Sequence, residues 1–142
     1  MILCKASEVG KIVVNKCLAR GIFLNTVKLE KLLVLMQLEC LERSKKPLFT
    51  EDIVVFKGVG VVIPQVDRDF LVNAVEFTEE QTSYIVLLDK EKESIEYVLE
   101  RYGHMDSFEL ESLYAIKKLD DLSIERNGKR VIPAFLLKAQ YL

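Results

Sequence analysis

Apolar positions recur every three or four residues at the start of the chain, as they do along one face of an amphipathic helix. This spacing predicts a helix over residues 4–20, with Gly21 as its stop because glycine readily takes the left-handed conformation that ends helices. Asn25 or Thr26 can cap a second helix by accepting a backbone N–H. The residues that set the first period are Val9, Ile12, Val13, Cys17 and Leu18.

The second helix, over residues 28–43, is apolar on most of its sides instead of along a single stripe. A helix of this kind is surrounded by protein, so we expect it to be the central and most buried helix. Pro47 prevents it from continuing past Lys45 and Lys46. Its apolar residues are Leu29, Leu32, Leu33, Val34, Leu35, Met36, Leu38, Cys40 and Leu41.

The middle of the chain changes to a β pattern. Residues 52–66 are rich in β-branched side chains and carry two glycines between two Val/Ile runs, which predicts a strand or hairpin with Pro64 at a strand end or edge. Residues 82–89 are a second strand candidate. A helix over residues 79–90 fits them nearly as well, because the period of a short apolar run does not separate the two.

The last third of the chain returns to a helical period. Residues 90–102 predict a helix that ends at Gly103, and Asp106 or Ser107 caps another helix that runs on to Lys117 and Lys118. The apolar side of this second helix is supplied by Phe108, Leu110, Leu113, Tyr114 and Ile116. The NGK tripeptide at 127–129 predicts a turn. After that turn, Pro133 suits the first turn of a closing helix.

Composition allows this chain a hydrophobic core of its own. It has 142 residues, of which 50% are hydrophobic. We therefore predict a mainly α fold with a small β element (α+β), a compact single-domain helical bundle over residues 1–142 around the central hydrophobic helix. No apolar run approaches the roughly 18 residues of a membrane span, and the first residues become charged too soon for a signal peptide. We expect a cytoplasmic protein.

The sequence offers little catalytic chemistry. His104 is the only histidine, and no GxGxxG or P-loop motif occurs. Cys4, Cys17 and Cys40 lie among apolar neighbours without a CxxC pair, so we expect three free thiols on helices. The pattern predicts a protein that is not an enzyme, with no catalytic, cofactor-binding or metal residues and no cofactor. The 20 basic and 22 acidic residues, with a net charge of −2, disfavour a dedicated nucleic-acid binder.

Four segments in a fixed order carry a resemblance. They are KLEKLLVLM at 28–36, KPLF at 46–49, IVVFKGVGVVIPQV at 53–66 and YVLERYG at 97–103. In this order the segments resemble those of the Panacea domain of bacterial and phage genomes, often the antitoxin half of a toxin–antitoxin pair, and with the helices before and after them the resemblance extends over nearly the whole chain. The chain departs from that family where Gly-Pro-Val is replaced by residues 60–62, and where Tyr114 and Ala115 stand in place of Thr and His.

The resemblance implies a protein-binding module. Such a module would be antitoxin-like or phage-associated, and would neutralise or regulate a protein partner, such as a cognate toxin, by direct contact. The alternatives are a nucleic-acid-binding regulator of its own operon and a phage accessory or anti-defence protein.

We place the partner-contact surface on residues 57–65 and on the turn at residues 102–104. Glycines let a backbone approach a partner closely. Val59, Val61 and Ile63 would be exposed along an edge whose unpaired N–H and C=O groups accept an added strand. The alternative is an ordinary hairpin packed on the core helix, with glycines that serve only its turns. The candidate contact residues are Lys57, Gly58, Gly60, Val62, Pro64, Gln65, Tyr102, Gly103 and His104.

Overall fold

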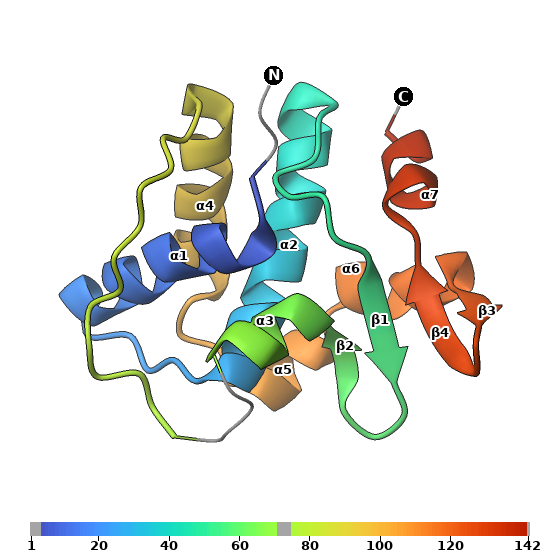
Figure 1. Cartoon of the computed structure of the whole chain (residues 1–142), viewed down its shortest axis with the longest axis horizontal. Coiled ribbons are helices and arrows are strands. Elements are labelled where there is room, and N and C mark those ends of the chain that lie inside the picture. The colour runs from blue at the N-terminus through green and yellow to red at the C-terminus, as the bar shows by residue number, and fades with distance from the viewer. Residues whose placement is uncertain (1–3, 71–74, 142) are drawn as a thin grey trace.

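A long helix, α2 (Thr26–Ser44), runs through the middle of the molecule, and the other helices and a small sheet lie around it (Figure 1). The computed structural model describes residues 4–70 and 75–141. The predicted α+β fold around a central apolar helix is confirmed. The other elements are α1 (Ala6–Arg20), β1 (Ile53–Phe56), β2 (Gly60–Val62), α3 (Pro64–Phe70), α4 (Asp89–Tyr102), α5 (Ser107–Glu111), α6 (Tyr114–Lys117), the 3-10 helix η1 (Lys118–Leu122), β3 (Ile124–Arg126), β4 (Lys129–Ile132) and α7 (Ala134–Ala139).

Helix α2 begins and ends where local chemistry dictates. The side chain of Asn25 accepts the backbone N–H of Lys28 at 2.9 Å, which satisfies one of the free donors of the first turn. Lys45 ends the helix in the left-handed conformation, with φ 59°. Every residue from 28 to 38 is buried. The prediction that this helix is the core helix is therefore confirmed.

The three cysteines are free and buried, but they are not all helical as predicted. Cys17 lies in α1 and Cys40 in α2, whereas Cys4 precedes α1 and forms an isolated β-bridge with Phe49. Burial raises the pKa of the Cys17 thiol to about 11, so this thiol stays protonated and unreactive at neutral pH.

The sheet joins the middle of the chain to its end. Its four antiparallel strands lie in the order β2-β1-β4-β3, so β1 pairs with its own hairpin partner and with a strand from the last part of the chain. The sequence predicted only the turn of the second hairpin, where Asn127 and Gly128 take φ 52° and 77°, as a tight Asn-Gly turn requires. Its strands were missed because β3 is exposed throughout and shows no alternation.

The β prediction for residues 52–66 is correct for the hairpin and wrong at its end. Pro64 opens α3, where its missing N–H costs no hydrogen bond, and does not lie at a strand edge. Residues 82–88 form neither strand nor helix, and α4 begins only at Asp89. No neighbouring strand lies beside them within the described residues, so an extended backbone there cannot become part of a sheet.

The helical prediction after Asp106 is correct in its cap and wrong in its length. Asp106 accepts the N–H of Glu109 at 2.8 Å. Helix α5 then ends at Glu111, and the chain restarts as α6 and η1. Gly103 takes φ −59° and not the left-handed conformation expected of it. Pro133 caps α7 from outside the helix.

Polar side chains of α2 are buried in the core and hold the surrounding loops. Gln37 donates from Nε2 to the Phe49 carbonyl at 2.9 Å, and its Oε1 accepts the N–H groups of Leu48 at 2.6 Å and Phe49 at 3.1 Å. Lys28 donates from Nζ to the carbonyls of Phe23 at 2.8 Å and Gly103 at 2.6 Å. Each side chain thus satisfies backbone groups that would otherwise lie buried and unpaired.

Glu30 is a buried acid that holds the start of α3. Its Oε2 accepts the N–H of Ile63 at 2.6 Å, and its carboxyl group is hydrogen-bonded to Asp67. Burial, reinforced by the hydrogen bond to Asp67, raises the pKa of Glu30 to about 9. A hydrogen bond between two carboxyl groups requires a proton on one of them, and the raised pKa of Glu30 favours that proton on Glu30.

Leu33→Ala should lower the free energy of unfolding by about 2–5 kcal/mol, because Leu33 is fully buried in α2 and its truncation leaves a cavity. Denaturant unfolding measures the change. Leu88→Ala is the control, since Leu88 is 60% exposed. Equal midpoints for the two variants would contradict the central place of α2.

Glu30→Gln should make stability less dependent on pH. The ordinary pKa of the carboxyl is 4.5 and the folded value is about 9, so between these values the native state keeps a proton that the unfolded chain releases. Wild-type stability therefore falls as pH rises through this window, by up to about 1.4 kcal/mol per pH unit. Glutamine retains both hydrogen bonds and cannot ionise.

Urea unfolding of Glu30→Gln between pH 5 and about pH 9 tests this. The control is Glu100→Gln, on the exposed side of α4, which should reproduce the wild-type pH dependence. A Glu30→Gln curve parallel to that of the wild type would show that Glu30 is ionised in the folded protein.

Candidate functional site

A groove of about 810 Å³ lies between the β1–β2 hairpin and the helices that follow α4. We call it the hairpin groove. Residues 55–61 form one wall, and Val27 and Lys31 of α2 form its base. The opposite wall comes from α5, α6 and η1 through Ser107, Phe108, Glu111, Ile116, Lys117 and Asp120.

The base of the groove is an ion pair. Lys31 Nζ lies 3.1 Å from Glu111 Oε1, and the Lys31 side chain is only 3% exposed. The same ammonium group donates to the carbonyls of Val59 at 3.0 Å and Val61 at 3.4 Å. Its hydrogen-bonding capacity is thus used within the protein. Lys31 holds the hairpin to α2 and α5.

The outward backbone groups of β2 are already bonded to side chains. Besides the two carbonyls bound by Lys31, the N–H of Val61 donates to Glu111 at 3.2 Å and that of Ile63 donates to Glu30. The expectation that Val61 and Ile63 are exposed is wrong, since only Val59 of the three is exposed. At these positions β2 offers no unpaired group to an added strand.

The structure brings together only part of the predicted contact surface. Lys57, Gly58 and Gly60 line the hairpin groove. Val62 is buried against Val54 and Val131. The remaining candidates lie outside the groove, and they are Pro64 and Gln65 in α3, Tyr102 at the end of α4, the buried Gly103, and the exposed His104.

The rim of the groove is more apolar than the sequence indicated. Phe56 is 40% exposed, Val59 50% and Phe108 82%. Sequence reasoning missed Phe108 because it placed this residue on the buried side of a long helix. In the five-residue helix α5 only Leu110 is buried, and Phe108 faces solvent.

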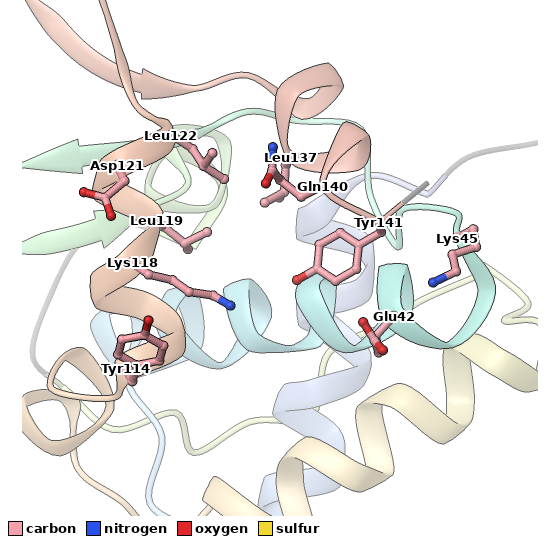
Figure 2. A pocket seen from close by; sticks show the side chains of 10 residues that line it. All are labelled: Glu42, Lys45, Tyr114, Lys118, Leu119, Asp121, Leu122, Leu137, Gln140 and Tyr141. Carbon is pink, nitrogen blue, oxygen red and sulfur yellow. The ribbon is translucent and has the colours of Figure 1, made fainter.

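A second hollow, of about 540 Å³, lies near the C-terminal end of α2, beside η1 and α7 (Figure 2). Glu42 and Asp121 contribute carboxylates to its lining, while Lys45 and Lys118 contribute ammonium groups. Burial, together with the nearby carboxylate of Glu42, raises the pKa of Tyr141. The two signs of charge balance, so this hollow has no net charge to select an ionic ligand.

The described residues contain neither a metal-binding cluster nor a membrane-spanning helix. Among residues 4–70 and 75–141, no cluster of three or more His, Cys, Asp or Glu side chains is placed to hold a metal ion. Within the same residues, no helix combines the length and the apolar character needed to cross a membrane.

Comparisons with protein-family models, with curated proteins and with solved structures find no match for this chain. The resemblance to the Panacea domain therefore stays a prediction from the residues. The structure gives its segments a shared physical role. Lys28 bonds to Gly103 of the YVLERYG segment, Lys31 to the hairpin segment, and Gln37 to the KPLF segment.

Gly60→Ala should destabilise the protein by at least about 1 kcal/mol more than Gly58→Ala. Both glycines have positive φ, 97° at Gly60 and 84° at Gly58, so both substitutions strain the backbone. A Cβ at Gly60 also overlaps the Glu111 carboxylate, whereas one at Gly58 meets open space. Thermal unfolding of the pair measures the difference. Equal losses would show that Glu111 does not pack on Gly60.

Proposed function

We propose that this protein is an antitoxin-like binding module that neutralises or regulates a partner protein by direct contact, and that the partner docks in the hairpin groove. The observation that carries the proposal is the exposed apolar rim of Phe56, Val59 and Phe108 around that groove. Exposed apolar clusters that line a concave surface are typical of interaction sites. Aromatic side chains commonly supply their main anchors.

The groove suits side-chain docking better than strand addition. Because the outward groups of β2 are bonded to α2 and α5, a partner gains little from backbone pairing there. An amphipathic helix can instead lay its apolar face between the hairpin and Phe108. Lys57 and Lys117 at the rim would favour acidic residues beside that face.

The Panacea resemblance supports the antitoxin reading of this binding role. Direct contact requires a shaped surface and no reaction chemistry, and we propose a non-catalytic protein that works in the cytoplasm. The nucleic-acid alternative has less support, because several cations that could form a basic patch are paired with carboxylates. Lys16 and Arg20 both contact Glu96, and Arg43 contacts Glu39. A paired cation contributes less to phosphate binding.

Phe108→Glu should weaken partner binding while the fold is retained, because Phe108 is 82% exposed. The expected loss in affinity is about 10–100-fold, as for an aromatic anchor of an interface. The measurement is affinity capture from the native host, identification of a stoichiometric partner by mass spectrometry, and titration of that purified partner by calorimetry.

Phe135→Glu is the matched control, since Phe135 is 67% exposed on α7 and does not line the groove. It should bind the partner like the wild type. Equal binding by the Phe108 variant would rule out the groove as the docking site. Salt-sensitive DNA binding without any protein partner would favour the regulator instead.

A further inference from the structure

A second surface lies on the opposite side of the molecule from the hairpin. Residues 75–88, which lead into α4, pass across the outside of α1 and are drawn in yellow-green in Figure 1. We call residues 82–88 the outer segment. Three β-branched residues, a tyrosine and two leucines stand among its seven residues, a composition typical of strands.

The outer segment is clamped at both ends and open between them. The Asn15 side chain acts as a strand partner for Gln81, donating to its carbonyl and accepting its N–H, each at 2.7 Å. At the other end Glu91 accepts the N–H of Leu88 at 2.7 Å. Between these clamps the backbone groups of residues 82–87 form no hydrogen bond to any described residue.

Side chains alternate along the outer segment as they do on a strand. Ile85 and Leu87 face the core. Tyr84 is 89% exposed, Val86 86% and Leu88 60%. An extended segment with open backbone groups and an apolar outer face is a template for pairing with another strand. No described residue hydrogen-bonds to the backbone of residues 82–87, unlike the edge of β2.

We infer that the outer segment pairs antiparallel with the same segment of a second copy of this chain, about a two-fold axis at Ile85. This register is self-complementary, as an isologous interface requires. It sets Tyr84 of each copy opposite Val86 of the other, an aromatic and β-branched pair of the kind that stabilises antiparallel strands. In this register Tyr84 and Val86 form a hydrogen-bonded pair, so their open N–H and C=O groups gain partners in the other copy.

Charge favours the same arrangement. Exposed Glu79 and Glu80 precede the outer segment. Exposed Lys90 and Lys92 follow it, together with Asp89 and with Glu93, whose carboxylate is paired with Arg43. Antiparallel pairing brings the acidic end of one copy to the lysines of the other, whereas parallel pairing would set glutamates against glutamates. The pairing leaves the hairpin groove free, so the dimer does not depend on the proposed function.

The interface is small, so the dimer should be weak. A two-stranded ladder of about six residues per copy is only marginally stable by itself, which points to a dissociation constant of roughly 1–100 µM. Sedimentation velocity over about 1 µM to 1 mM spans this range. The wild type should shift from monomer to dimer with rising concentration. A wild type that stays monomeric throughout would overturn the inference.

Two substitutions at one position separate backbone pairing from simple apolar contact. Val86→Pro removes an N–H that donates to no described residue and should raise the dissociation constant at least about tenfold. Val86→Thr keeps the N–H and the strand preference and should stay within about threefold of the wild type. Circular dichroism verifies that both remain folded. Dimerisation of the proline variant at wild-type strength would contradict the inference.

Cysteine cross-linking tests the register. Tyr84→Cys mixed with Val86→Cys should form a disulfide-linked dimer under mild oxidation, because directly opposed positions come within disulfide reach. Each variant alone should cross-link at least about tenfold less, since identical positions lie on a diagonal. The native cysteines are buried and remain as an internal control. Equal cross-linking in the separate and mixed samples would overturn the Ile85 axis.

Discussion

The structure depends on one constraint: the buried polar side chains of α2 must each have a hydrogen-bond partner. An unpaired polar group in a core costs about 1–3 kcal/mol and a charge costs more. Lys28, Glu30, Lys31 and Gln37 are all buried on the central helix. Their partners come from loops far apart in the sequence, so the helix organises these loops while its apolar residues fill the core.

The same constraint shapes the hairpin surface. The side chains of Lys31, Glu30 and Glu111 bind the outward backbone groups at the edge of β2. Because these groups are hydrogen-bonded, the edge cannot use them to pair with another strand. What remains exposed is the apolar rim of the hairpin groove. The hairpin groove is therefore attached directly to the core helix through the Lys31–Glu111 pair.

The outer segment differs from β2 because, between its ends, its backbone groups are not hydrogen-bonded to any described side chain. Asn15 and Glu91 hold its ends, and no residue among 4–70 and 75–141 hydrogen-bonds to the backbone between them. The two surfaces lie on different sides of α2 (Figure 1). At the hairpin groove the backbone groups of β2 are hydrogen-bonded and only apolar side chains are exposed. In the outer segment the backbone groups lack partners among the described residues and apolar side chains are exposed as well. This difference is the physical reason for assigning them different kinds of partner.

The sequence by itself determined the elements whose signals are local. The all-round apolar pattern of α2, its Asn25 cap, the stop at Gly21 and the Asn-Gly turn at 127–128 depend on neighbouring residues, and all four are present. Tertiary structure decided whatever depends on a partner distant in sequence. The β3 and β4 strands, the unpaired outer segment and the solvent-facing Phe108 are of this kind. A strand exists only if another lies beside it, and a side chain is exposed only if nothing packs over it.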